Sequence, residues 1–228
     1  MGDHGNCNDC DDLVLHRCDI DTLLPGQWLN DQVIEFALRR IGDSANPGES
    51  NRNGKVVLVP PATSQLFLHA PDVASGVARD LHLDISAGPI LFCLNNATDV
   101  SRPLSGTHWS ALVVLTETYG ARRQVWHLHY DSMSGGANDH LAERMSDTLK
   151  AVFGTPDAGL QQVVSFSGRQ KNSHDCGVFL LAVALAYMEG GPGGQEEVDR
   201  LIHGIDQVGV DALRRRLLEE VKVMVDSR

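Results

Sequence analysis

The spacing of apolar residues along the chain predicts a series of strands. Runs rich in β-branched and aromatic residues have the length of strands, and polar or glycine-containing segments separate them. We predict strands at residues 56–59, 89–94, 109–115, 125–130 and 162–166, with a short edge strand at 13–16.

Apolar residues at helical spacing predict helices between these strands. The predicted helices cover residues 31–41, 63–69, 72–80 and 139–153, and one or two more follow residue 194. Asn30 or Asp31 is expected to cap the first of them, and Gly42 to end it. The segment Cys176–Met188 is apolar on every side, so we expect a helix that crosses the core. Strands together with several helices, one of them buried, indicate an α+β fold.

One domain is expected over residues 13–228, because the chain shows no internal repeat and no long linker. Residues 1–12 are rich in aspartate and are expected to form a disordered acidic leader. Over residues 1–31, seven acids stand against one base, and a partner with a basic tail is the alternative interpretation of this charge.

Composition argues against several classes of function. The 19 Lys+Arg and 30 Asp+Glu give a net charge of −11, whereas nucleic-acid binding needs a basic surface. The longest apolar stretch has 11 residues, fewer than the roughly 20 that cross a bilayer. The N-terminus resembles no secretory signal, and five cysteines without framework spacing fit a reducing compartment. We therefore expect no nucleic-acid or membrane partner, and a monomer in the cytoplasm and/or nucleus.

Common metal and phosphate motifs are missing or incomplete in the sequence. It contains no His-Glu-x-x-His helix and no Gly-x-Ser-x-Gly turn, and Gly48–Lys55 is one residue too long for a phosphate-binding loop. Cys7-x-x-Cys10 lacks a second closely spaced ligand pair, although a closed zinc site needs four ligands. We expect neither a metal nor a cofactor.

Cys176 is the candidate nucleophile. It follows a polar segment and begins the predicted buried helix, where unpaired N–H groups and the helix dipole stabilise a thiolate. Gly177 is expected to leave room for a substrate. A cysteine that packs as a small hydrophobe is the alternative interpretation, and it fits Cys93, inside an apolar strand, better.

A cysteine nucleophile needs a base, and the base needs a group that orients it. His108 opens one predicted strand and Asp131 closes the next. If the two strands pair antiparallel, the two residues become neighbours. Asp131 then binds one imidazole nitrogen while the other faces the sulfur.

Gln170 is the candidate second donor of an oxyanion hole. It precedes Cys176 by six residues, so its amide is expected to act with the Cys176 backbone N–H. An ordinary loop glutamine is the alternative. Three other histidines are not expected to be the base: His174 is too close to Cys176 in sequence, and His127 and His129 are expected to be structural or solvated.

Four blocks carry a resemblance to a known family. They are Trp28-Leu29-Asn30-Asp31, Gly106-Thr107-His108-Trp109-Ser110, His129-Tyr130-Asp131-Ser132 and Gln170-x-Asn172-x-x-Asp175-Cys176-Gly177. In this order and at these spacings they resemble the ubiquitin-like-protein proteases, the clan of cysteine peptidases that includes SUMO proteases and deneddylases. The resemblance spans about residues 13–225 and is nearest to the deneddylase branch.

The resemblance implies a papain-like α+β fold in permuted order (His, Asp, Cys), with a central mixed sheet flanked by helices and a buried helix beginning at the nucleophile. It implies the same roles for His108, Asp131, Gln170 and Cys176 as the reasoning from the residues.

The resemblance also implies a substrate channel. Trp28 and Trp109 would cover a narrow passage that admits only the modifier's C-terminal Gly-Gly, and Asp31 would contact the modifier's extended tail. Core packing of each tryptophan and helix capping by Asp31 are the alternatives.

The function that we predict is therefore a thiol isopeptidase that cleaves after the Gly-Gly of a ubiquitin-like modifier. A deneddylase acting on conjugates such as cullins, on modifier precursors, or on both is favoured, and a SUMO protease with the same residues is the alternative. A non-catalytic modifier-binding module and an acetyltransferase of the same clan are further alternatives.

Overall fold

The computed structural model describes residues 13–45, 56–97, 106–133, 135–163, 170–190 and 194–226. The predicted acidic leader, the Cys7-x-x-Cys10 motif and the whole Gly48–Lys55 segment lie outside these residues, as does the end of the strand predicted at 162–166. Within the described part of the chain, no helix has the length and apolar character needed to span a membrane.

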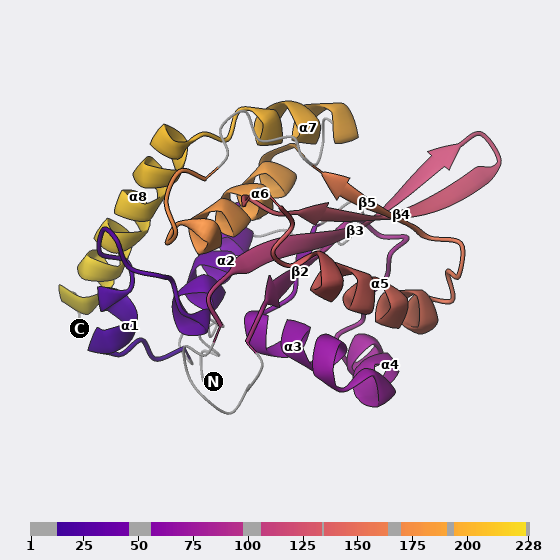
Figure 1. Cartoon of the computed structure of the whole chain (residues 1–228), viewed down its shortest axis with the longest axis horizontal. Coiled ribbons are helices and arrows are strands. Elements are labelled where there is room, and N and C mark those ends of the chain that lie inside the picture. Colours follow the sequence, from indigo (N-terminus) through magenta and orange to yellow (C-terminus); the bar gives the residue numbers. More distant parts are fainter. Residues whose placement is uncertain are drawn as a thin grey trace, which may run out of the picture.

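A five-stranded mixed sheet forms the centre of the molecule (Figure 1). Its strands are β1 (Val57–Leu58), β2 (Ile90–Asn95), β3 (Trp109–Tyr119), β4 (Arg122–Tyr130) and β5 (Gly159–Val163). They lie side by side in chain order. The two outer pairs, β1–β2 and β4–β5, are parallel, whereas the central pairs β2–β3 and β3–β4 are antiparallel.

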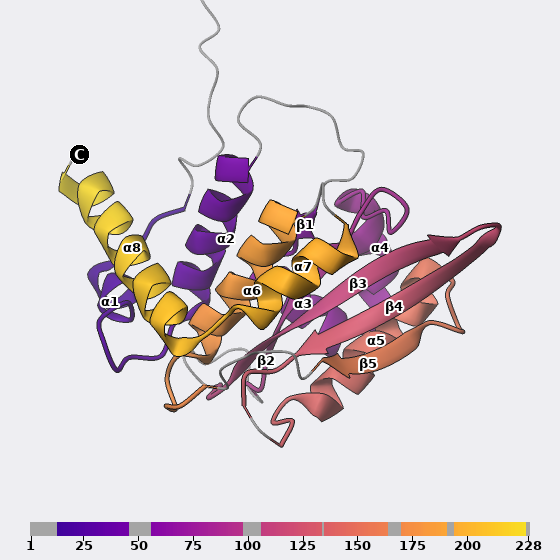
Figure 2. The same ribbon diagram turned by 90° about the horizontal axis from the view of Figure 1, so that it is seen from above.

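Helices cover both faces of this sheet (Figures 1 and 2). They are α1 (Arg17–Asp21), α2 (Asp31–Ala45), α3 (Pro61–His69), α4 (Pro71–Asp80), α5 (Asp139–Phe153), α6 (Cys176–Gly190), α7 (Gln195–His203) and α8 (Gln207–Asp226). Buried residues of α3, α4 and α5 form the core on one face. Those of α2, α6, α7 and α8 form the core on the other.

The apolar residues of strand β2 contribute to the cores on both faces of the sheet. Side chains alternate between the faces of a strand, so Leu91 and Cys93 pack with α6 while Phe92 and Leu94 pack with α3 and α5. Because helices cover both faces, every residue of β2 is buried. The expectation that Cys93 is a core residue is confirmed.

Helix α6 crosses the core as predicted, because eleven of its fifteen residues are buried and spread around the whole helix. Near its C-terminal end the Tyr187 hydroxyl is 2.8 Å from that of Tyr130, the last residue of β4. This contact joins α6 to the strand that leads into Asp131. The α+β class, with a mixed sheet and a buried helix, is confirmed.

Two predicted elements differ in the structure. Residues 13–16 do not form a strand; Leu13 and Leu15 are partly buried against the core, but no strand pairs with them. Helix α2 does not end at Gly42 but continues to Ala45. Gly42 has no positive φ, so it is an ordinary helical glycine rather than a left-handed helix terminator.

Candidate active site

The structure brings His108 and Asp131 together at one end of the β3–β4 pair. His108 directly precedes β3 and Asp131 directly follows β4, and Ala111 pairs with Tyr130 in antiparallel register. The distance from His108 Nε2 to Asp131 Oδ1 is 2.7 Å. Antiparallel pairing therefore makes the two strand ends neighbours, as the sequence predicts.

Asp131 is held in place by the turn that follows it. The backbone N–H of Met133 donates to Oδ1 at 2.9 Å and that of Asn138 donates to Oδ2 at 3.2 Å. Burial alone would raise the pKa of Asp131, but the hydrogen bond and charge of His108 and these two N–H groups lower it. The carboxylate is therefore ionised where it meets the imidazole.

The segment before His108 is fixed by two asparagines at the end of β2. Asn96 Oδ1 accepts the backbone N–H of both Thr107 (2.7 Å) and His108 (3.0 Å). A Cβ on Gly106 would lie 1.7 Å from Asn95 Oδ1. The glycine therefore allows this segment to run directly over the end of β2.

Cys176 is the first residue of α6 and is 2% exposed. Its backbone N–H has no acceptor within the helix, as at the start of any helix. A Cβ on Gly177 would lie 3.1 Å from Leu29 Cβ and 3.3 Å from Ile34 Cδ1. The expectation that Gly177 leaves room for a substrate is therefore wrong: this glycine lets the start of α6 pack closely on Leu29 and α2.

The imidazole of His108 interacts with both Asp131 and Cys176. Burial by itself would lower the pKa of His108, but the hydrogen bond to Asp131, the charge of Asp131 and the nearby Cys176 raise it to about 9. Because Nε2 is bonded to Asp131, Nδ1 is the nitrogen left for the sulfur. Nδ1 is buried and has no hydrogen-bond partner among the described residues, so its bond to the sulfur belongs to the proposed reaction.

Gln170 lies beside the segment that carries Asp131. Its backbone N–H donates to the Ser132 carbonyl (3.2 Å), and its Oε1 accepts from Ser132 Oγ (2.7 Å). Its Nε2 donates to the Asn172 carbonyl at 2.7 Å. Nε2 also donates to Asn172 Oδ1 at 3.4 Å, so the amide faces Asn172 in this structure and its role in an oxyanion hole stays a prediction.

The three predicted substrate-binding residues lie in different environments. Trp28 is 43% exposed, whereas Trp109 is buried and its Nε1 donates to the Leu29 carbonyl at 3.0 Å. Asn30 Oδ1 accepts the N–H of Val33, so Asn30 caps α2 and the exposed Asp31 is left available for a ligand. The channel between the two indoles stays a prediction.

Several supporting residues were not given a role from the sequence. Asn95 and Asn96 follow an apolar strand directly, and that position was the available signal. Asn138 stands just before the helix predicted at 139–153. Its Nδ2 donates to Ser110 Oγ at 2.9 Å, and its backbone N–H donates to Asp131. The predicted structural role of the β4 histidines fits the structure, since His127 and His129 are both fully buried.

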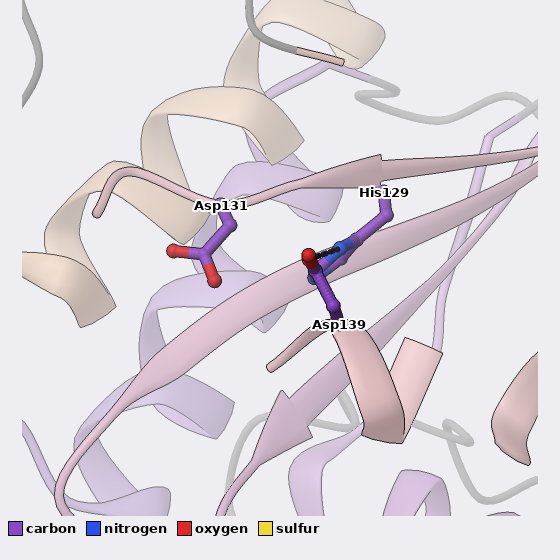
Figure 3. A group of neighbouring side chains, drawn as sticks. All are labelled: His129, Asp131 and Asp139. Carbon is purple, nitrogen blue, oxygen red and sulfur yellow. Dashed lines mark ion pairs between the residues drawn. The ribbon is translucent and has the colours of Figure 1, made fainter. Parts of the chain in front are cut away.

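His129, Asp131 and Asp139 form a group whose ligand atoms lie within 4.8 Å of one another (Figure 3). Their atoms already have partners. His129 contacts Gln162 through Nδ1 and Ser110 Oγ through Nε2, and both oxygens of Asp131 accept hydrogen bonds. Burial lowers the pKa of His129, so its 3.4 Å contact with Asp139 involves a neutral ring. The contact between His129 and Asp139 joins β4 to the first residue of α5.

Similar proteins define the family of the chain. Residues 27–228 match the Ulp1 protease family, C-terminal catalytic domain. NEDD8-specific protease 1 of Arabidopsis thaliana is 28% identical over 230 residues, which covers 97% of this chain and 95% of that protein. Sentrin-specific protease 8 of Mus musculus is 30% identical over 171 residues, 75% of this chain and 72% of that protein.

Solved structures show the same fold. A de-sumoylating protease superposes with a TM-score of 0.65 at 13% identity, covering 92% of this chain and 85% of that one. The SUMO protease Ulp1, with its catalytic cysteine oxidised to a sulfonic acid, gives 0.61 at 19% identity, covering 88% and 80%. The family expected from the four sequence blocks is thus confirmed. The chain belongs to the Ulp1 protease family and is a cysteine peptidase.

Proposed function

We propose that this protein is a thiol isopeptidase that cleaves after the C-terminal Gly-Gly of a ubiquitin-like modifier, with a NEDD8-type modifier preferred. The observation that carries the chemistry is the 2.7 Å His108–Asp131 pair, whose imidazole also interacts with Cys176. The preference is supported by the similarity to NEDD8-specific protease 1, which extends over nearly the whole of both chains. Conjugates such as cullins, modifier precursors, or both are the proposed substrates, in the cytoplasm and/or nucleus.

The first half of the reaction transfers the modifier to the enzyme. The Cys176 thiolate attacks the carbonyl carbon of the terminal glycine, and a C–S bond forms. The backbone N–H of Cys176 and the amide of Gln170 stabilise the oxyanion. The C–N bond then breaks as the His108 imidazolium donates its proton to the leaving lysine amine, which leaves a thioester and a neutral imidazole.

Hydrolysis completes the cycle. The neutral His108 takes a proton from water while the water oxygen attacks the thioester carbonyl. The C–S bond breaks, which releases the modifier's carboxylic acid and restores the thiolate–imidazolium pair, and the acid then loses its proton to solvent. Asp131 keeps the ring oriented through both halves because it binds Nε2 and leaves Nδ1 to carry the proton.

Binding of the modifier's tail is proposed at Trp28, Asp31 and Trp109. Trp28 offers an exposed indole. The indole N–H of Trp109 donates to the carbonyl of Leu29, the residue that follows Trp28. Asp31 is exposed at the start of α2 and is suited to a tail that carries a basic side chain or N–H donors. A slot bounded by two indoles would select glycines by size alone.

A protease for a different modifier, such as SUMO, is the second candidate. Membership of the Ulp1 protease family is compatible with it. The catalytic residues would be the same, so only the modifier-binding surface distinguishes the two candidates.

Cleavage assays on modifier fusions test the proposal. NEDD8, SUMO and ubiquitin, each extended beyond Gly-Gly, would be incubated with the wild type, Cys176→Ala and Cys18→Ala, the last being a matched control at an exposed thiol. We expect the wild type and Cys18→Ala to cut the NEDD8 fusion fastest, and Cys176→Ala to bind it without cutting. Faster cutting of SUMO would support the second candidate, and undiminished cutting by Cys176→Ala would refute the mechanism.

A further inference from the structure

Arg214, in the C-terminal helix α8, is a buried cation with several partners. It is 5% exposed. Its Nε donates to Asp175 Oδ1 at 3.0 Å and its Nη2 lies 2.8 Å from the same oxygen. Nη1 donates to the Thr22 carbonyl at 2.9 Å, and Nη2 to the His174 carbonyl at 3.2 Å. One side chain therefore joins three segments that are distant in sequence.

Asp175 precedes Cys176 and is itself buried. Its second oxygen, Oδ2, accepts from Asn172 Nδ2 and from Gln207 Nε2, each at 2.6 Å. Burial would raise the pKa of Asp175, but the hydrogen bond from Asn172 and the charge of Arg214 lower it. An ionised carboxylate therefore sits one residue from the nucleophile, and Arg214 balances its charge.

The same contacts extend to the proposed oxyanion donors. Asn172 accepts from Gln170 through its carbonyl and from the backbone N–H of Asp175 through Oδ1. Gln170, Asn172, Asp175 and Cys176 thus form one hydrogen-bonded turn, in which the Asp175 carboxylate binds Arg214. A shift of this turn would move the Gln170 amide and the Cys176 N–H relative to each other.

On its other side, Arg214 holds the segment that leads to the proposed tail-binding site. The carbonyls of Thr22 and Leu24, at 2.9 and 3.4 Å from Nη1, belong to the turn after α1. Four residues after Leu24 the chain reaches the exposed Trp28. The guanidinium therefore lies between the turn before Trp28 and the turn before Cys176.

We propose that Arg214 is a positioning residue, whose guanidinium fixes the nucleophile turn 170–176 against the turn 22–24 and so keeps the two oxyanion donors aligned. This inference rests on the proposed function. A compact positive charge would not position both turns, because this role needs the planar, forked guanidinium, which binds a carboxylate and the backbone carbonyls of two separate segments at once.

The alternative is that Arg214 only neutralises a buried carboxylate, and two variants separate the two roles. Asp175→Asn leaves Arg214 in place with its carbonyl contacts. The double variant, Asp175→Asn with Arg214→Met, also removes the cation that the single variant leaves unpaired. Replacing both members of a buried ion pair by uncharged groups often leaves the stability of the fold unchanged or raises it. The double variant is therefore expected to be at least as resistant to urea as the single one.

For kcat, the ranking of the two variants is expected to be the opposite of their ranking in stability. With a NEDD8–fluorophore fusion, we expect kcat of the double variant to be about tenfold or more below that of Asp175→Asn, because small misplacements of reacting groups lower rates strongly. KM is expected to change less than about threefold, since the modifier-contacting side chains are intact. Arg216→Met, at an exposed arginine of the same helix, is the control and should match the wild type.

Two outcomes would overturn the inference in distinguishable ways. A kcat for the double variant equal to or above that of Asp175→Asn would show that Arg214 only balances charge. A wild-type protein that turns over no modifier fusion would instead refute the proposed function, and with it any positioning role in that reaction.

Discussion

At the scale of single residues, the protonation of His108 governs the proposed chemistry. The imidazole is bonded to the Asp131 carboxylate and lies near Cys176, and its pKa is raised to about 9. At neutral pH it is therefore protonated, which is the form that stabilises a thiolate and supplies the leaving group's proton. The same shift stabilises the fold: the contribution is present in full below pH 6.5, the ordinary histidine pKa, and is lost as the pH rises through about 9.

Removing the carboxylate at position 131 is expected to shift the alkaline limit of activity. In the wild type, kcat/KM should fall as the pH passes about 9. In Asp131→Asn, the decline should begin at lower pH, because one group that raises the pKa of His108 has lost its charge. At pH 7 the rate should fall about 10²-fold, since the ring also loses its orienting acceptor. Rate profiles from pH 6 to 10.5 measure this, and an unchanged alkaline limb would contradict it.

The two tryptophans are expected to respond differently to truncation. Trp28 is 43% exposed and Trp109 is 7% exposed. Trp28→Ala should raise KM about tenfold, as for a contact tryptophan at an interface, with little change in unfolding free energy. Trp109→Ala should lower the unfolding free energy by about 3–5 kcal/mol. Urea unfolding and steady-state kinetics on both variants check the pair, and a Trp28→Ala enzyme with wild-type KM would remove this residue from the binding site.

The catalytic residues were predictable because their signals are local. His108 and Asp131 stand at the ends of consecutive strands, so antiparallel pairing predicts their contact. Cys176 is marked by the change from a polar turn to an apolar helix. Gly177 was misinterpreted because the sequence does not say whether a glycine faces a substrate or, as here, Leu29 and Ile34 in the core.

At the scale of secondary-structure elements, the approach of the pre-β3 segment to β2 depends on Gly106. Asn95 is buried and its Oδ1 also accepts the N–H of Ala97 at 2.8 Å, so this side chain has little freedom to move aside. A Cβ at position 106 would lie 1.7 Å from that oxygen. The segment that carries His108 must therefore shift if the glycine is replaced.

Gly106→Ala is accordingly expected to lower kcat by about 10²-fold while the protein stays folded, because His108 moves relative to Cys176. Gly42→Ala is the matched control: nothing lies within 4 Å of its added Cβ, and it lies within helix α2. It should raise the unfolding free energy by about 0.5–1 kcal/mol and leave kcat unchanged. Gly106→Ala with a wild-type kcat would contradict the role given to this approach.

Element boundaries were less predictable than the elements themselves. Gly42 predicted a helix end, but a glycine without positive φ is compatible with a continuing helix, and α2 runs on to Ala45. Residues 13–16 alternate between half-buried and exposed positions as a strand can, yet both edges of the sheet, β1 and β5, are elsewhere. In both cases tertiary packing decided what the local pattern left open.

At the scale of the whole molecule, a second histidine of interest, His127, is buried on the face of the sheet that α3, α4 and α5 cover. It is fully buried between β4 and α5, its Nδ1 lies 2.8 Å from Ser146 Oγ, and its Nε2 has no partner within the described part of the chain. Burial, aided by the positive charge of Lys150, lowers its pKa to about 4. The folded state therefore keeps this ring neutral where the unfolded chain protonates it.

Acid is expected to destabilise the protein through His127. Above pH 6.5, His127 is neutral in both the folded and the unfolded protein. Between about pH 6.5 and 4 only the unfolded protein binds a proton at this residue, so the unfolding free energy falls over that interval. It should reach up to about 3 kcal/mol. Urea unfolding at pH 7 and pH 4 should show a smaller loss for His127→Gln than for the wild type, with the exposed His140→Gln as control. An equal loss in all three proteins would contradict the assignment.

Contacts across the whole chain were beyond prediction from the sequence. Arg214 and Thr22 are separated by 192 residues and meet through a guanidinium and a backbone carbonyl. A backbone carbonyl carries no sequence signal, and an arginine in an amphipathic helix is typical of a solvated face. The buried position of Arg214 follows only from how α8 packs beside α6 and the turn after α1.

The central claim is that Cys176 attacks the modifier's terminal glycine carbonyl, and the most direct measurement uses modifiers that carry an electrophile there. NEDD8, SUMO and ubiquitin with such a C-terminus would each be incubated with the protein, and the modified residue located by mass spectrometry. We predict a single adduct on Cys176, formed fastest with the NEDD8 probe and much more slowly in His108→Ala. No adduct with any probe, or an adduct on Cys18 or Cys93 instead, would contradict the account.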